Sequence, residues 1–345
     1  MVECDLAKVE VAGSNPVSRF RSTKIAGSVP GYLLLGDAGS KLPMSKLVVA
    51  LLFLLAQDTL RVNVSLVSVG VRVRDSRGQN VRGLKAEDFL VFDDGVLQKI
   101  EFFSEMEQPM MLGILLDHSD SMTYNNKLDR AKEAAITLVR SAHEGSEFFY
   151  VAFDDAVTVA EDVTEDRYQI ESAIQDTRPG GGTKLYDAVL KGVELNQKAE
   201  LSRQALVIIS DGTDQDSRSR LADVLKVVRG SKMQVYSIGY FSGQEEGLFR
   251  RSGARIELID GAFVDNPRVV LQKLARESGA ASFFPRSDKE LAKAVEDIVS
   301  DLHTQYTLAF YPQYLNQESL YHKLRVTVRG NRYDVRARPG YGVKL

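Results

Sequence analysis

The sequence is poor in the residues that form covalent cross-links or bind soft metals. Its 345 residues include one cysteine, Cys4, and four histidines. The cysteine and histidines show none of the close spacings typical of zinc ligands. A soft-metal site is therefore not expected, and the chain must depend on its hydrophobic core for stability.

The chain also lacks a strong excess of either charge. Its formal net charge is -3 at pH 7, and basic and acidic residues are intermixed along the sequence. This balance argues against nucleic acid or an anionic membrane surface as the main partner. Hydrophobic residues make up 44% and charged residues 26%, which is typical of a soluble globular protein with one large domain or two modest ones.

Residues 44–56, MSKLVVALLFLLA, contain an apolar run that is too short to span a bilayer. A methionine and Lys46 precede this run, and the small residue Ala56 follows it, which is the arrangement of a secretory signal peptide. The alternative is a short buried strand or helix. We expect an exported protein, in the periplasm, in the cell envelope or secreted, with no stable transmembrane segment after signal cleavage.

A signal peptide must begin the chain, so residues 1–43 need an explanation. They show no clear periodicity. We expect translation to start at Met44 and residues 1–43 to be a mis-annotated or disordered leader, in which case Cys4 is absent from the exported protein.

Two flanking segments, residues 57–108 and 305–345, are dominated by short alternating apolar runs. The alternation in LRVNVSLVSVGVRVRD and in YHKLRVTVRG predicts antiparallel strands, and residues 93–95, DDG, predict a tight hairpin turn. We expect the two segments to form one split β-sandwich, or two small sheets, on either side of the central segment.

The central segment, residues 109–304, alternates buried strands with amphipathic helices. This pattern predicts an α/β domain with a doubly wound, mostly parallel, Rossmann-like sheet. Helices are expected to begin at a cap on Asp265 or Asn266 and at the Ser287–Glu290 capping pattern, whereas residues 240–266 are expected to form a long loop. The expected strands are MLGILLD, FFYVAFDD, AVTVA, ALVIISD, MQVYSIGY and ASFF.

Oxygen-bearing side chains follow two predicted strands and open one predicted helix. Asp117, Ser119 and Ser121 form a DxSxS pattern after the first strand, Thr183 follows a glycine-rich turn, and Asp211 follows the strand ALVIIS. In such sheets, ligands bind at the carboxyl ends of the strands. A shell of hydroxyl and carboxylate oxygens without sulfur is typical of a hard divalent cation.

The motifs DHSDSM, GGGTKLYDA and ISDGTD resemble the metal-ion-dependent adhesion site (MIDAS) of von Willebrand factor type A (VWFA) domains. The resemblance covers roughly residues 110–303, and the flanks resemble a bacterial subfamily called VWFA-related. It implies that Ser119, Ser121 and Thr183 bind the cation directly, and that Asp117 and Asp211 act mainly through water or hydrogen bonds.

The resemblance further implies a divalent-cation-dependent adhesion or assembly module rather than an enzyme. The cation is expected to be magnesium, with manganese or calcium as alternatives, and the partner is expected to be a protein that offers an Asp or Glu. His118, Asp120 and Asp214 are candidates for the rim that contacts this partner. Asp120 departs from the family pattern, which usually has glycine at this position.

Two other functions remain open on the sequence. One is a structural envelope scaffold with a degenerate metal site. The other is a metal-dependent phosphoesterase in which Asp117, Asp120, Asp211 and Asp214 hold paired ions, although the expected histidines are missing. A Ser/His hydrolase is disfavoured because no GxSxG motif occurs, and PGGGTK does not match a nucleotide-binding P-loop.

Overall fold

The computed structural model describes residues 66–105, 108–198, 200–257, 261, 263–303, 306–312, 321–330 and 332–342. The chain divides into two units, Met1–Val62 and Asn63–Leu345, and every described residue belongs to the second. Cys4, the predicted leader and the predicted signal peptide lie outside the described residues.

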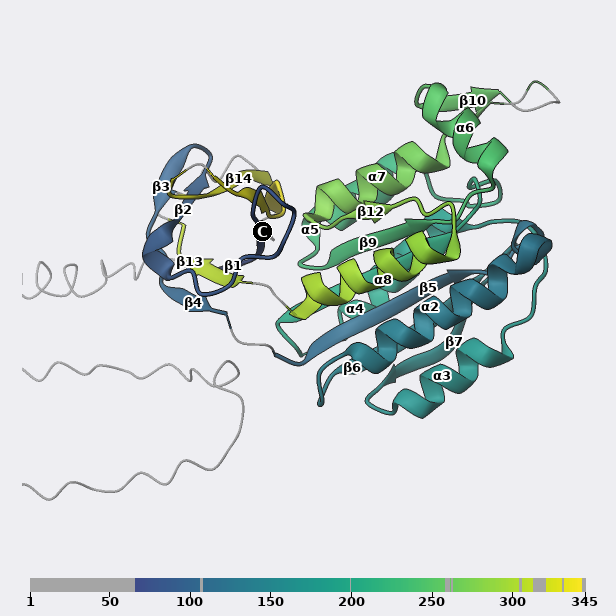
Figure 1. The fold of residues 1–345 in the computed structure, drawn as a ribbon, viewed down its shortest axis with the longest axis horizontal. Helices are drawn as coiled ribbons and strands as arrows, with labels where there is room; N and C mark the ends of the chain where they lie inside the picture. Colours follow the sequence, from purple (N-terminus) through teal and green to yellow (C-terminus); the bar gives the residue numbers. More distant parts are fainter. Residues whose placement is uncertain are drawn as a thin grey trace, which may run out of the picture. The chain divides into compact units, whose positions relative to one another are not determined.

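A six-stranded sheet forms the centre of the α/β domain (Figure 1). Its strand order is β12-β9-β8-β5-β6-β7, and every neighbouring pair is parallel except β6 and β7. The predicted doubly wound, mostly parallel sheet is confirmed. The strands are β5 (Met110–Asp117), β6 (Glu147–Phe153), β7 (Val157–Thr164), β8 (Arg203–Ser210), β9 (Gln234–Gly239) and β12 (Ser282–Phe283).

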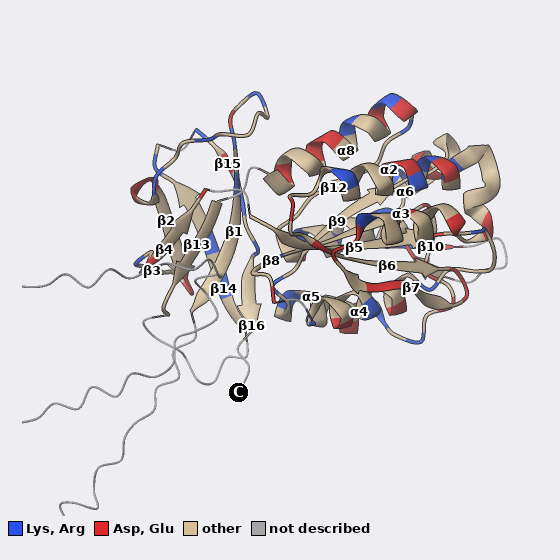
Figure 2. Ribbon diagram, turned by 90° about the horizontal axis from the view of Figure 1, so that it is seen from below, with Lys and Arg blue, Asp and Glu red and all other residues tan. Residues whose placement is uncertain are grey.

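Helices cover both faces of this sheet, because apolar side chains alternate to opposite sides along its buried strands. Leu112, Ile114 and Leu116 of β5 pack on the face covered by α2 (Lys127–Ser141), α3 (Arg167–Asp176) and α8 (Asp288–His303). Met111 and Leu115 pack on the opposite face. That face is covered by α4 (Leu185–Asn196), α5 (Leu221–Gly230) and α7 (Pro267–Ser278). Figure 2 shows charged residues mainly on the helices and loops around this sheet.

The strand order reverses beside β5. The chain leaves β5 through α2 toward β6 on one side, and later returns through α4 to β8 on the other side. The loops that follow β5 and β8 therefore diverge at this point, which leaves room at the carboxyl end of the sheet. Every side chain predicted to bind the cation lies on a segment that ends or begins at this edge.

The helix starts at α7 and α8 follow the predicted capping chemistry. The side chain of Asn266 accepts a hydrogen bond from Arg268 N, and Pro267 occupies the first turn of α7. At α8, Glu290 N donates to Ser287 Oγ. These hydrogen bonds define the first turns of α7 and α8, which are the last two helices of the α/β domain.

The expectation of a long loop over residues 240–266 is wrong. This segment contains α6 (Gly243–Arg251) and a hairpin of β10 (Arg255–Glu257) and β11 (Phe263–Asp265). The signal for α6 is a capping box, in which Glu245 N donates to Ser242 Oγ and Ser242 N donates to Glu245 Oε2.

The flanking segments form two four-stranded antiparallel sheets with one shared core. Phe89 and Tyr306, from strands of different sheets, pack with ring centroids 5.0 Å apart. This split β-sandwich agrees with the expected fold class. One sheet has the order β15-β1-β13-β4 and the other β16-β14-β2-β3, with bounds β1 (Val67–Arg74), β2 (Phe89–Asp93), β3 (Val96–Gln98), β4 (Phe102–Ser104), β13 (Tyr306–Phe310), β14 (Tyr321–Val328), β15 (Asp334–Arg336) and β16 (Gly340–Gly342).

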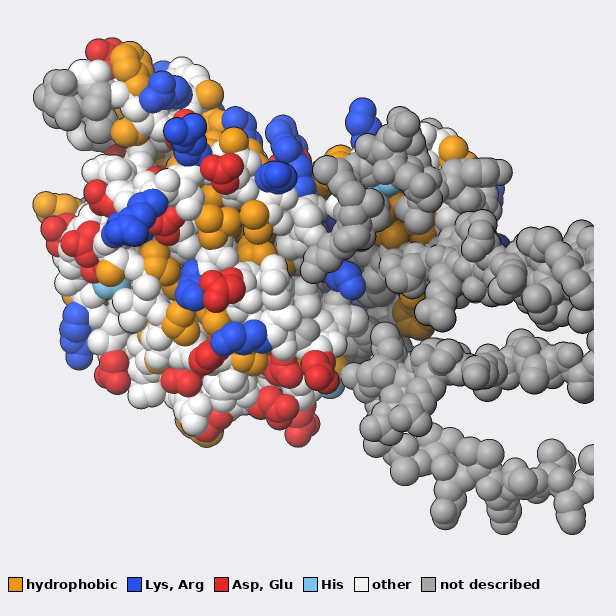
Figure 3. Space-filling model, turned by 180° about the vertical axis from the view of Figure 1, so that it is seen from behind, with side chains coloured by type: hydrophobic (Ala, Val, Ile, Leu, Met, Phe, Trp, Pro, Cys, Tyr) orange, Lys and Arg blue, Asp and Glu red, His pale blue; other side chains and the backbone are white. Residues whose placement is uncertain are grey.

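In the described part of the chain, no helix has the length and apolar character needed to cross a membrane. On the face drawn in Figure 3, basic and acidic side chains both occur across the surface.

Candidate metal centre

The first part of the site is the turn that leaves β5. Asp117 is the last residue of β5 and is fully buried. Its Oδ1 accepts a hydrogen bond from Ser119 N at 3.0 Å, and its Oδ2 accepts one from Ser210 Oγ at 2.5 Å. Asp117 therefore holds the turn after β5 against the end of β8.

Two serine hydroxyls and a second carboxylate converge beside this turn. Ser119 Oγ and Ser121 Oγ are 3.1 Å apart, and Ser121 Oγ donates to Asp211 Oδ1 at 2.8 Å. Ser121 lies in the short 3-10 helix η2 (Asp120–Asn126), and Asp211 directly follows β8. The strand-end positions predicted from the sequence thus become neighbours across β5 and β8.

Thr183 is held at the same edge by the segment that follows β8. Its N donates to Asp216 Oδ2 at 3.0 Å, and its carbonyl accepts from the backbone N of Gln215 and Asp216. A Cβ on Gly212 would lie 3.2 Å from Thr183 Oγ1 and 3.4 Å from Asp117 Oδ2. Glycine at position 212 therefore keeps the space between these two oxygens open.

The two buried carboxylates make this region electrostatically unfavourable. Burial, followed by the negative charge of Asp211, raises the pKa of Asp117 to about 7. Burial also raises the pKa of Asp211, although the Lys127 ammonium opposes that shift. A cation near both groups would offset the cost of burying them as anions.

Lys127 was not predicted and changes the charge of the site. Its ammonium forms an ion pair with Asp211 Oδ2, and the Lys127 side chain is only 6% exposed. Glu245 of α6 lies 3.5 Å from the same ammonium. Lys127 is the first residue of α2 and follows Asn125 and Asn126, both of which have positive φ. This conformation sets the direction in which α2 begins, and the residue pattern of the helix does not reveal it.

The three predicted rim residues have different environments. His118 is partly buried, and its Nδ1 donates to the carbonyl oxygen of Arg178 at 2.7 Å. Asp120 is exposed and does not have a positive φ, so its backbone does not require the glycine usual in the family. Asp214 Oδ1 accepts hydrogen bonds from Tyr186 N and Ser217 Oγ, which places this carboxylate at the start of α4.

Residues 112–213 match the family model for the von Willebrand factor type A domain. This range includes all three segments that supply Asp117, Thr183 and Asp211. The resemblance seen in the sequence is therefore confirmed for this part of the chain. No curated protein sequence matches the chain.

Several solved structures resemble the chain at low identity. Conserved hypothetical protein BatB from Bacteroides thetaiotaomicron is 18% identical with a TM-score of 0.43, over 56% of this chain and 98% of that chain. A von Willebrand factor type A protein from Catenulispora acidiphila is 13% identical with a TM-score of 0.47, over 82% and 75%. Proximal thread matrix protein 1 from the mussel byssus, with a zinc-occupied MIDAS motif, is 17% identical with a TM-score of 0.46, over 61% and 49%.

Proposed function

We propose that this chain is a divalent-cation-dependent protein-binding module, used for adhesion or assembly. Ser119, Ser121 and Thr183 would hold the cation with their hydroxyl oxygens. Asp117 and Asp211 would orient those hydroxyls and supply negative charge. The observation that carries the proposal is the convergence of these oxygens from three separate segments at one edge of the sheet.

The spacing of the oxygens fits a small hard cation. Neighbouring ligands of an octahedral magnesium ion lie about 2.9 Å apart, given bonds of about 2.0–2.1 Å. The two assigned ligand atoms Ser119 Oγ and Ser121 Oγ are 3.1 Å apart, which is close to this value. The donor set consists of oxygen alone, which favours magnesium, with manganese or calcium as alternatives.

The charge of the site favours an acidic partner. Hydroxyl ligands are neutral, and Lys127 compensates the charge of Asp211. A bound divalent cation would therefore keep excess positive charge and open coordination positions for a carboxylate from an Asp or Glu of a partner protein. The sequence feature that supports an exported location is the signal-peptide pattern over residues 44–56.

We further propose that the module is not an enzyme. Ser119 Oγ hydrogen-bonds with Ser121 Oγ, and His118 Nδ1 donates to the Arg178 carbonyl, so the described hydrogen bonds do not join His118 as a base to the Ser119 hydroxyl. The paired-ion phosphoesterase is also disfavoured. Among the described residues, the groups of three or more carboxylate, histidine or cysteine ligands within 4.8 Å do not include Asp117, Asp120, Asp211 and Asp214.

Calorimetric titration of magnesium, manganese and calcium into the full chain tests the proposal. Ser121→Ala removes an oxygen of the shell and should abolish measurable binding. Thr123→Ala is a matched control, because the Thr123 hydroxyl lies in the same loop but donates to the carbonyl of Asp120. Equal cation binding by both variants would refute the assigned site.

A structural scaffold is a second candidate, and the ion pair of Lys127 with Asp211 favours it. In that case the ammonium supplies the positive charge that the buried aspartate needs, and the site serves the fold alone. Cation titration separates the two functions. A scaffold would bind none of the three cations, either alone or with a carboxylate-rich peptide present.

A further inference from the structure

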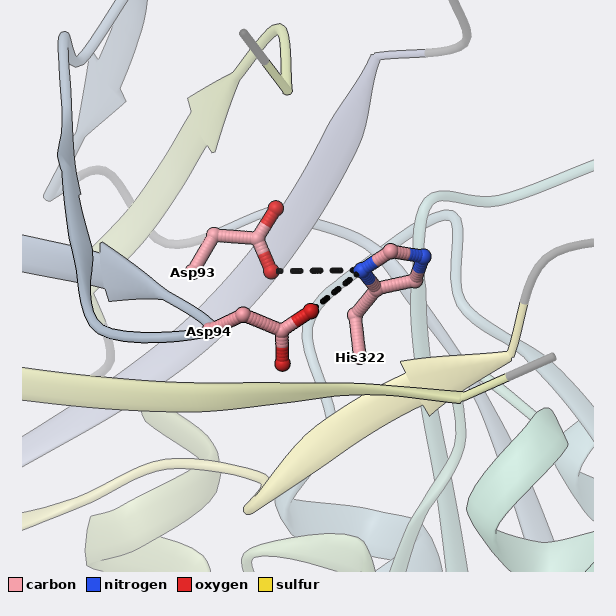
Figure 4. A group of neighbouring side chains, drawn as sticks. All are labelled: Asp93, Asp94 and His322. Atoms are coloured by element: carbon pink, nitrogen blue, oxygen red, sulfur yellow. Dashed lines mark hydrogen bonds and ion pairs between the residues drawn. The ribbon is translucent and has the colours of Figure 1, made fainter. Parts of the chain in front are cut away.

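A second cluster of ligand-type side chains lies in the β-sandwich, and the proposed function does not use it. Asp93 ends β2, Asp94 follows it in the hairpin turn, and His322 is the second residue of β14 (Figure 4). One ligand atom from each residue lies within 4.8 Å of the other two. From the sequence alone, Asp93 and Asp94 are expected only to form a hairpin turn.

Hydrogen bonds between the Asp94 turn and the backbone of Lys323 hold this cluster in place. Asp94 has a φ of 46°, and its Oδ1 accepts a hydrogen bond from Lys323 N at 2.8 Å. Asp94 N in turn donates to the carbonyl of Lys323 at 2.9 Å. The turn is therefore locked beside His322, and Asp94 Oδ2 lies 2.8 Å from His322 Nδ1.

Asp93 supplies an oxygen that has no hydrogen-bond partner. Its Oδ2 accepts a hydrogen bond from Tyr341 OH at 2.8 Å, but its Oδ1 is buried and makes no hydrogen bond. The Asp93 side chain is only 3% exposed, and this free oxygen is directed at His322 Nδ1 from 3.9 Å. Figure 4 shows both carboxylates turned toward the same ring nitrogen. A buried carboxylate oxygen that makes no hydrogen bond costs folding free energy, so the arrangement favours a bound cation.

The distances and donor types fit a cation of the zinc class. Tetrahedral zinc with bonds of about 2.0–2.1 Å separates neighbouring ligand atoms by about 3.3 Å. The two separations from His322 Nδ1, 2.8 and 3.9 Å, lie on either side of this value. A mixed set of imidazole nitrogen and carboxylate oxygen suits zinc better than magnesium. Asp94 is exposed and lines a surface hollow, which provides a route of entry.

We propose that Asp93, Asp94 and His322 form a zinc-class cation site that ties the β2–β3 turn to β14. Asp94 and His322 are 228 positions apart in the chain, so the bound ion would join strands from its two flanking segments. Tyr341 supports this site as a positioning residue, because it binds Asp93 and stacks on the His322 ring at 5.2 Å. The proposal does not depend on the MIDAS-type site.

Titration of zinc chloride into the full chain tests this site. All chains carry Ser121→Ala, which suppresses zinc binding at the α/β domain. Asp94→Asn removes one ligand charge while its amide oxygen can still accept from Lys323 N, and asparagine tolerates a positive φ. Asp75→Asn is the matched control, because Asp75 also stabilises a turn of the sandwich, through Arg77 N and Gln79 N.

We expect one zinc ion per Ser121→Ala chain, unchanged by Asp75→Asn and weakened at least about tenfold by Asp94→Asn. Zinc should also raise the thermal midpoint of the first two chains but not that of the Asp94→Asn chain. Equal zinc affinity in the Asp94→Asn and Asp75→Asn chains would overturn the proposal. Absence of zinc binding by the Ser121→Ala chain would also overturn it, and would leave the cluster as an ion pair of His322 with two carboxylates.

Discussion

The α/β domain and the β-sandwich each gather ligand-type side chains, but they do so by different routes. In the α/β domain, Asp117 ends β5, and Thr183 and Asp211 lie in loops at the same edge of the mostly parallel sheet. Most of the candidate ligand atoms there are hydroxyl oxygens. In the sandwich, Asp93 and His322 come from antiparallel strands at opposite ends of the sequence, and the donors include nitrogen. The oxygen-only set fits the proposed hard-cation site, and the mixed oxygen and nitrogen set fits the proposed zinc-class site.

This difference determines how well each site can be predicted from a sequence. The loops that follow the strands of a parallel sheet lie at the same edge, and this does not depend on the exact strand register. Oxygen-bearing residues placed just after such strands therefore predict a binding site from the sequence. A site between paired antiparallel strands depends on register, because a shift of one residue would turn His322 to the other side of β14.

The largest effect is expected from Asp211→Ala. This change removes an acceptor of Ser121 and leaves the buried Lys127 ammonium without its nearest carboxylate. We expect loss of magnesium binding and a decrease of about 3 kcal/mol in the free energy of unfolding, measured by urea titration with chelator present. Adding Lys127→Met should restore most of the stability but not the binding. An unchanged urea midpoint for Asp211→Ala would contradict the energetic role given to this ion pair.

A smaller loss of stability is expected from His322→Gln. The change removes the partner of Asp94 and the ring that stacks on Tyr341. In metal-free buffer we expect a decrease of about 1–2 kcal/mol in the free energy of unfolding, while the magnesium affinity stays at its original value. Calorimetry and urea titration on the same samples check both parts. A change in magnesium affinity would show that the two sites are coupled.

Lys127→Met is expected to strengthen cation binding. Removal of a positive charge that contacts Asp211 should lower the magnesium dissociation constant by about tenfold, since the charge repels the cation at short range. Lys191→Met serves as the control, because Lys191 pairs with Glu194 on the exposed side of α4. Weaker binding by the Lys127→Met chain would indicate that the ammonium helps to build the site.

The smallest effect is expected from Asp120→Gly, which restores the residue usual in the family. Asp120 is exposed, so solvent screens its carboxylate. We expect magnesium binding to weaken by about twofold to fivefold, and calorimetry at two salt concentrations should show a smaller difference at the higher one. A loss of binding would mean that Asp120 is itself a ligand.

Much of the fold could be predicted, because apolar runs mark the buried strands and capping residues mark the helix starts. The runs that became β5 and β8 are buried on both faces, and the Ser287 and Glu290 pair marks the start of α8. The helix α6 was not predicted, although Ser242 and Glu245 have the same capping spacing, because residues 240–266 are long for a strand-to-helix connection and this length favoured a loop. The Ser242 and Glu245 pair is the signal in the sequence that predicts α6.

The candidate site in the α/β domain was predictable in its ligand types but not in its charge. Asp117, Ser119, Ser121, Thr183 and Asp211 were singled out by spacing and strand-end position, and the structure brings them together. Lys127 was not found, because a lysine at the start of an amphipathic helix gives no indication that its side chain turns inward. Ser210 lies within a motif that was noticed, yet its hydrogen bond to Asp117 depends on the parallel pairing of β5 with β8.

The split sandwich also determines the order in which its strands can pair as the chain is synthesised and folds. β2 pairs with β3 next to it in the chain, but its other neighbour, β14, is made only after the entire α/β domain. Contacts of such long sequence separation close late, because the loop entropy must be lost before the pairing is gained. During synthesis β1 and β2 are therefore made before β13 and β14, the strands that pair with them, and a chain truncated before β13 is expected to expose these strand edges and to aggregate.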